Sequence, residues 1–157
     1  EYKSFAVIRD PMQRILSAYS NRVLHHRALK KPAVVAALIE KQLPPNPDIN
    51  EFIMQLGQYR KVSGEILSHT RPLRYFLGKD LSRFDRIFTI QQMPELARYL
   101  SEITGREISI PRFQTGGDKQ DLEMLTLEAF EKLRELCKPD YEIAQAYLTI
   151  PERNALV

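Results

Sequence analysis

Apolar residues near the start of the chain change from a continuous run to a helical spacing. Four of them in succession, Phe5 to Ile8, predict a short buried strand. Asp10 and Pro11 predict the start of a helix, because a carboxylate caps free amide groups and proline at the first helical position loses no hydrogen bond. The helix has one apolar stripe, which consists of Met12, Ile15, Leu16, Tyr19 and Val23.

A similar strand and helix follow in the second half of the chain. Alternating apolar residues over 84–90 predict the strand. The helix would begin near Pro94 and end at Gly105, where glycine suits the residue after a helix. Together the two units predict a helix-rich α/β fold with a small parallel sheet flanked by helices.

The segments between and after these units have helical patterns. An apolar run over 33–43 and a helix capped by Asp48 or Asn50 predict a helical insert of about 32–62. An amphipathic helix is expected over 122–136, and a last helix would begin at 138–142.

Polar residues around the first turn suggest an anion site. Arg9 leaves the carboxyl end of a strand, where open α/β sheets bind ligands, and a helix N-terminus beside it favours negative charge. The residues spaced by three or four along the polar face of that helix are Arg14, Ser17, Asn21 and His25. The alternative is that Arg9 pairs with a carboxylate and that this polar face only contacts water.

Arg9-Asp10-Pro11, Arg14 and Ser17-Ala18-Tyr19 together resemble the Arg-Asp-Pro-x-x-Arg-x-x-Ser-x-Tyr motif of carbohydrate sulfotransferases. The resemblance implies a P-loop-type sulfotransferase fold and the donor PAPS (3′-phosphoadenosine 5′-phosphosulfate). In that family the matching Arg and Ser bind the 3′-phosphate, which assigns this role to Arg9 and Ser17. Arg14 would line or brace the same site.

The segment from His69 to Leu73 is similar to a His-x-x-Pro-Gln segment of the same family, with leucine in place of glutamine. A neutral imidazole could take the proton of an acceptor hydroxyl, so His69 is the candidate general base. It could instead only order a loop, and His25 and His26 are further candidates.

Two weaker similarities concern the C-terminal part of the chain. In the wider family a loop equivalent to 111–119 often supplies a basic residue to the 3′-phosphate, for which Arg112 and Lys119 are candidates. The segment 136–147 is similar to the end of sulfotransferase domains, which supports the fold and not the chemistry.

Composition narrows the class of protein. A chain of 157 residues suits a single domain, and a formal net charge of +3 gives no argument for a nucleic-acid partner. Cys137, the single cysteine, is expected in the core and excludes an intrachain disulfide, which favours a cytoplasmic location. No run approaches the roughly 18 apolar residues of a membrane span. Cys and His residues do not occur at zinc spacing, and sulfuryl transfer needs no metal.

The chain begins at Glu1, close to the first strand, so the sequence predicts one sulfotransferase-like domain over 1–157 that is incomplete at its N-terminus. It would lack the family's first strand and its 5′-phosphosulfate loop. The expected function is PAPS-dependent sulfation of a carbohydrate or similar small acceptor. The alternative is a non-catalytic module that binds an anion or a partner. A nucleotide kinase relative is disfavoured, because the chain has no Gly-x-x-x-x-Gly-Lys-Ser/Thr loop.

Overall fold

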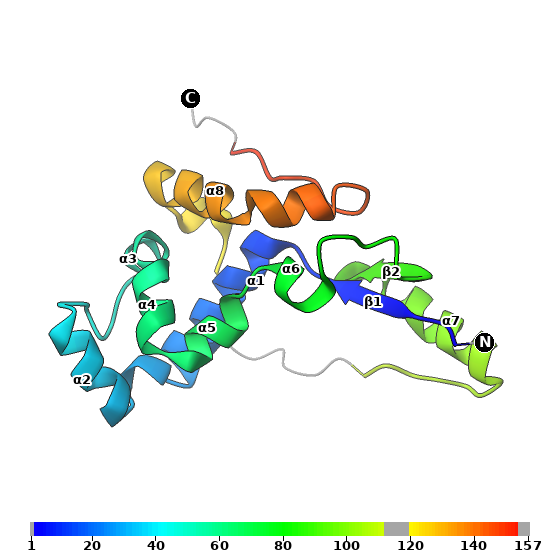
Figure 1. Cartoon of the computed structure of the whole chain (residues 1–157), viewed down its shortest axis with the longest axis horizontal. Coiled ribbons are helices and arrows are strands. Elements are labelled where there is room, and N and C mark those ends of the chain that lie inside the picture. Colours follow the sequence, from blue (N-terminus) through cyan, green and yellow to red (C-terminus); the bar gives the residue numbers. More distant parts are fainter. Residues whose placement is uncertain (1, 112–119, 154–157) are drawn as a thin grey trace.

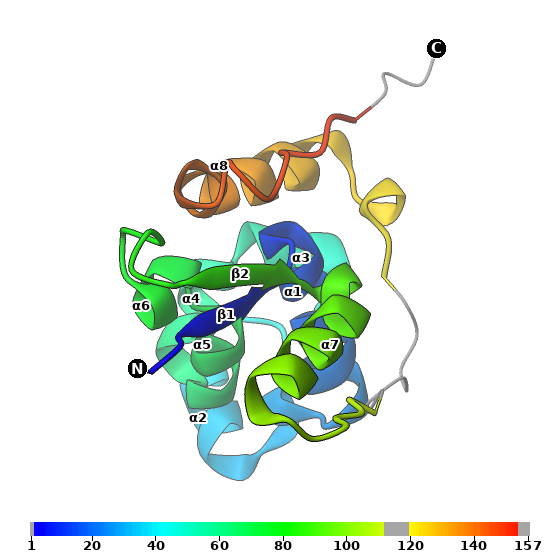
Figure 2. The same ribbon diagram turned by 90° about the vertical axis from the view of Figure 1, so that its right-hand side faces the viewer.

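The computed structural model describes residues 2–111 and 120–153 of the chain. Two parallel strands, β1 (Phe5–Ile8) and β2 (Arg86–Thr89), pair in register from Phe5 opposite Arg86 to Ile8 opposite Thr89. The helices in chain order are α1 (Pro11–Ala18), α2 (Pro32–Glu40), α3 (Ile49–Met54), α4 (Leu56–Val62), α5 (Gly64–Thr70), α6 (Leu73–Leu77), α7 (Met93–Thr104) and α8 (Leu127–Ile143). Figures 1 and 2 show α8 on one side of the sheet and α7 on the other.

Helix α1 begins as the sequence predicts. The Asp10 carboxylate accepts a hydrogen bond from the Gln13 amide at 2.9 Å, and Pro11 is the first helical residue. All five residues of the predicted apolar stripe are buried. After Ala18 the chain continues as a π-helix (Tyr19–His25). Because a π-helix bonds each residue to the fifth one along, the spacing of three or four does not carry the polar face of α1 on to Asn21 and His25.

The main core lies between α1, the α3–α5 region and α8, and Figure 1 shows α8 running along the top of these helices. Its largest fully buried side chains include Phe52, Tyr59, Phe130 and Tyr141. A smaller cluster, which contains Phe88, packs α7 against β2. The predicted fold class, a helix-rich α/β fold with a small parallel sheet flanked by helices, is confirmed.

The second strand and the helix after it also follow the prediction. Gly105 ends α7 with a φ of 64°, a left-handed conformation that glycine adopts without steric cost. Of the two candidate caps for α3, Asp48 accepts the Glu51 amide at 2.9 Å, whereas the Asn50 side chain accepts the Thr126 amide.

The predicted last helix starting at 138–142 is wrong, because Pro139 lies inside α8 and the helix continues to Ile143. An interior proline removes one backbone hydrogen bond and normally breaks a helix. Here the residues that follow it are held by distant partners. Asp140 accepts the Leu73 amide at 2.8 Å, and the Tyr141 hydroxyl donates to Asp10 at 2.5 Å. Tertiary contacts therefore outweigh the local signal.

Candidate functional site

The exposed Arg9 side chain and Ser17 converge at the end of β1. Arg9 follows the last strand residue, and Ser17 lies near the end of α1. The Arg9 Nη2 donates a hydrogen bond to the Ser17 Oγ at 2.7 Å. A guanidinium and a hydroxyl at this distance can both donate to one anionic group. The strand, the turn at Asp10 and the helix thus bring together a cation and a hydroxyl that are eight positions apart.

Arg14, the second arginine of the motif, has different surroundings. Its side chain is only 20% exposed, and its Nη2 donates to the Arg71 carbonyl. The same nitrogen lies 4.0 Å from the Asp140 Oδ2, and the guanidinium lies 5.8 Å from the ring centre of Phe76. Burial lowers the pKa of Arg14, while the Asp140 carboxylate opposes that shift. The described contacts of Arg14 therefore run to α6, α8 and the α5–α6 turn.

Two residues of α8 contact the motif although no sequence pattern predicted a role for them in the site: Tyr141 at Asp10 and Asp140 at Arg14. Tyr141 donates to the Asp10 Oδ2, whose other carboxylate oxygen caps α1. The Asp140 side chain is only 5% exposed, and burial raises its pKa against the opposing effects of the Leu73 amide and Arg14. An Asp-Tyr pair after an interior proline was the available signal, but a single sequence does not identify its partners.

His69 lies in the last turn of α5, and the backbone beside it is fixed by two arginines. Arg60 on α4 donates through Nε to the Thr70 Oγ1 at 2.9 Å and through Nη2 to the Thr70 carbonyl. Arg14 donates to the next carbonyl, that of Arg71. Cations at a helix C-terminus interact favourably with the carbonyl end of the helix dipole. The structure thus anchors the chain directly after the candidate base.

The charges around His69 favour its neutral form. Burial lowers the pKa of the imidazole, Arg22, Arg14 and His26 lower it further, and Glu65 raises it. Glu65 is itself paired with Lys31 and lies 3.9 Å from the Arg22 Nη1. An imidazole with a lowered pKa is uncharged at neutral pH and can accept a proton.

The other candidate side chains differ in exposure. His25 and His26 are both exposed, with ring centres 4.7 Å apart. Cys137 is buried, as predicted, and burial raises the pKa of its thiol to about 12. A thiol that stays protonated at neutral pH is a poor nucleophile. Arg112 and Lys119, expected near the 3′-phosphate, lie outside the described residues.

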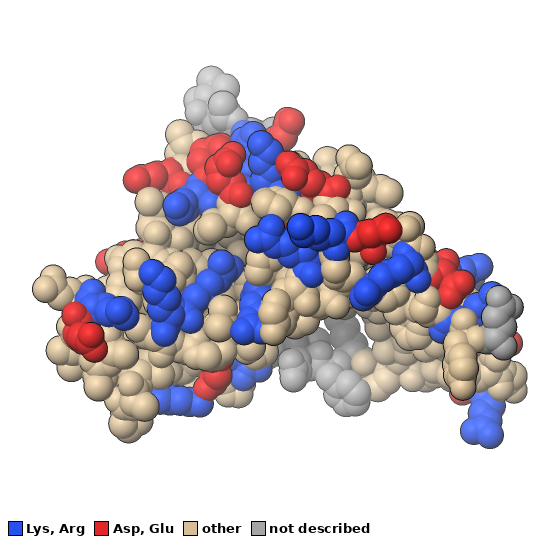
Figure 3. All heavy atoms as spheres, viewed as in Figure 1, with Lys and Arg blue, Asp and Glu red and all other residues tan. Residues whose placement is uncertain are grey.

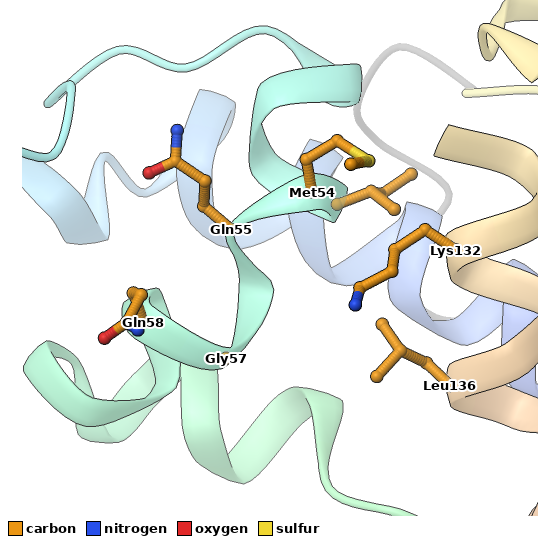
Figure 4. A pocket seen from close by; sticks show the side chains of 7 residues that line it. Met54, Gln55, Gly57, Gln58, Lys132 and Leu136 are labelled. Atoms are coloured by element: carbon orange, nitrogen blue, oxygen red, sulfur yellow. The ribbon is translucent and has the colours of Figure 1, made fainter. Parts of the chain in front are cut away.

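A cavity of about 240 Å³ lies between α3, α4 and α8, away from the motif residues (Figure 4). Its walls include Ile53, Gly57 and Leu136, and the Lys132 amine points into it from α8. Arg9, Ser17 and His69 are not among the residues that line it. The cavity does not form part of the candidate site.

The face shown in Figure 3 carries Lys and Arg side chains over the band from α4 to α6, and side chains of both signs over α8. Arg71, between α5 and α6, stacks on Tyr75, with its guanidinium carbon 3.9 Å from the ring centre. Within the described ranges no helix has the length and apolar character to cross a membrane, and His, Cys, Asp and Glu residues form no group that could hold a metal ion.

Comparison with known proteins identifies the family. A family model described as sulfotransferase family matches residues 1–143, which is most of the chain. No curated protein and no solved structure matches the chain. The matched range includes both strands, the first turn, α1, the His69 segment and all of α8.

Proposed function

This chain belongs to the sulfotransferase family, and on that premise we propose that it transfers the sulfuryl group of PAPS to a hydroxyl of a carbohydrate or similar small acceptor. Family membership supports a sulfotransferase activity. The observation that carries the finer proposal is the convergence of Arg9 and Ser17 at the carboxyl end of β1.

The 3′-phosphate of PAPS would bind between Arg9 and Ser17. One Arg9 N–H donates to the Ser17 Oγ, which leaves the hydroxyl hydrogen of Ser17 and further guanidinium N–H groups to donate to phosphate oxygens. A hydrogen bond from a charged donor contributes about 1.5–3 kcal/mol. Arg14 would brace the helix that presents Ser17, and Arg112, outside the described residues, remains a candidate for a further phosphate contact.

The candidate base is His69. In the proposed reaction the acceptor hydroxyl oxygen bonds to sulfur, the bond from sulfur to the 5′-phosphate oxygen breaks, and the hydroxyl proton passes to the neutral imidazole. The lowered pKa of His69 supports this role, because it keeps the base unprotonated at neutral pH. Acceptor contacts are proposed in the helical insert of about 32–62.

The donor site is tested by calorimetric titration with PAP (3′-phosphoadenosine 5′-phosphate), the product that keeps the 3′-phosphate. We expect the wild-type protein to bind PAP and Arg9→Ala to bind it about 10- to 100-fold more weakly, as the loss of charge-assisted hydrogen bonds implies. Arg98→Ala is the matched control, because it removes an arginine whose side chain is 74% exposed on α7. Equal affinities for wild type and Arg9→Ala would contradict the proposed site.

The transfer step is tested separately, by following a radiolabelled sulfuryl group from PAPS to a mixed oligosaccharide pool. Transfer of the label to the saccharides by the wild-type protein supports the transferase activity. Loss of that transfer in His69→Ala supports His69 as the base. PAP binding without any transfer would instead favour the alternative function, a non-catalytic anion-binding module on the same fold.

A further inference from the structure

The Arg14 guanidinium contacts three protein groups: a backbone carbonyl, a carboxylate and an aromatic ring. Its Nη2 donates to the Arg71 carbonyl and faces the Asp140 Oδ2 at 4.0 Å, and the guanidinium lies against the Phe76 ring. Its Nε is buried and has no hydrogen-bond partner among the described residues. Because the Arg14 side chain is only 20% exposed and its contacts run to the α5–α6 turn, α6 and α8, it presents little surface to a ligand.

Asp140 extends the contact from α1 to the start of α6. Its Oδ1 accepts the Leu73 amide at 2.8 Å, while its Oδ2 faces Arg14. The carbonyl of Arg71 and the amide of Leu73 flank Pro72, so Arg14 and Asp140 hold both ends of this short turn. The turn directly follows His69 and Thr70.

We propose that Arg14 is a positioning residue, which together with Asp140 holds the segment from His69 to Leu73 in place relative to the helix that presents Ser17. The inference deepens the proposed function and rests on it, because it relates the candidate base to the candidate phosphate site. Arg14 connects α1 to the turn after His69. Its backbone belongs to α1, which also carries Ser17, and its guanidinium donates to the Arg71 carbonyl in that turn. Loss of this link would let the base move without removing a phosphate ligand.

The pKa of the His69 imidazole depends on whether Arg14 is in place. The charged and titratable groups that act on it are Arg22 from the π-helix, His26 directly after that helix, Arg14 from α1 and Glu65 from α5 itself. Among these, Arg14 lowers the His69 pKa and Glu65 raises it. A displaced or missing Arg14 therefore raises the pKa of His69.

The test compares Arg14→Met and the milder Asp140→Asn with the control Tyr141→Phe, all in the full chain. Tyr141→Phe removes the hydrogen bond between Asp10 and α8, but it does not touch the 71–73 turn. The measurements are the affinity for PAP, the hydrogen exchange rate of the Leu73 amide, and the His69 pKa from NMR titration. Asp140→Asn keeps an oxygen for the Leu73 amide, so a folded variant without the ion pair is available.

For Arg14→Met we expect a PAP affinity within about threefold of the wild type, because Arg14 does not contact the phosphate. The Leu73 amide should exchange at least about tenfold faster and the His69 pKa should rise. Asp140→Asn, which keeps both Arg14 and an oxygen for the Leu73 amide, should change the two signals less than Arg14→Met does, and Tyr141→Phe should change neither. If wild type fails to bind PAP, the proposed function fails, while the two NMR signals still decide whether Arg14 positions the turn.

Two results would overturn the inference. A loss of PAP affinity of about tenfold or more in Arg14→Met, with the Leu73 exchange rate unchanged, would make Arg14 a phosphate ligand. Equal changes at Leu73 and His69 in Arg14→Met and Tyr141→Phe would mean that both variants only loosen the packing of α1 on α8.

Discussion

The two arginines of the motif, Arg9 and Arg14, have opposite environments although they are five positions apart. Arg9 is exposed at the end of β1, and its guanidinium donates to the hydroxyl of Ser17. Arg14 is largely buried and bonds to a backbone carbonyl, with a buried carboxylate beside it. An exposed arginine that bonds to a hydroxyl still has N–H groups with which to bind a ligand. A buried arginine instead uses its hydrogen bonds and its charge to stabilise the fold.

The comparison separates two tasks within one short motif. The first arginine and the serine provide donors at the strand end, and the second arginine connects their helix to the turn after His69. The same residue type serves both tasks, so the motif letters alone do not distinguish them. Burial and partners do, and changes at each arginine should therefore have different consequences.

The largest expected effect on stability is that of Arg14→Met, because the substitution removes the arginine that forms an ion pair with the buried Asp140 carboxylate. Removing one partner of a buried pair costs about 3–5 kcal/mol in the free energy of unfolding. Urea unfolding followed by circular dichroism measures this difference. The control is Arg134→Met, which removes a surface arginine paired with Glu131 at 3.2 Å and should cost less than about 1 kcal/mol. Similar losses in the two variants would remove the distinction between the buried and the exposed pair.

A much smaller effect on stability is expected for Ser17→Ala. The substitution removes the acceptor of the Arg9 hydrogen bond, but the exposed guanidinium can bond to water instead. The free energy of unfolding should change by less than about 0.5 kcal/mol. The same urea experiment decides the point, and a loss comparable to that of Arg14→Met would show that the Arg9–Ser17 contact is structural.

The local elements could be predicted from the sequence because their causes are local. Asp10 and Pro11 start α1, Gly105 ends α7, and the apolar spacing after Met12 identifies the buried face of the first helix. The motif resemblance paired Arg9 with Ser17, and their contact is also local, since only the turn at Asp10 and two helical turns separate them.

The partners of Arg14 could not be predicted in this way. Arg71 is 57 positions away from Arg14, and Asp140 lies on another helix beyond a proline that locally predicts a helix boundary. The position of α8 depends on the packing of Phe130, Leu133 and Tyr141 into the common core, which a single sequence does not specify. The contacts that distant segments make with the motif residues are therefore the part of the site that could not be predicted from the sequence.

The central claim, that Arg9 binds the 3′-phosphate of the donor, is tested most directly by a cycle of two proteins and two ligands. PAP and adenosine 5′-phosphate, which lacks the 3′-phosphate, are titrated into wild type and Arg9→Ala under the same salt conditions. The account predicts that Arg9→Ala weakens PAP binding by about tenfold or more and changes the affinity for adenosine 5′-phosphate by less than about twofold. An equal loss for both ligands, or no loss for either, would contradict it.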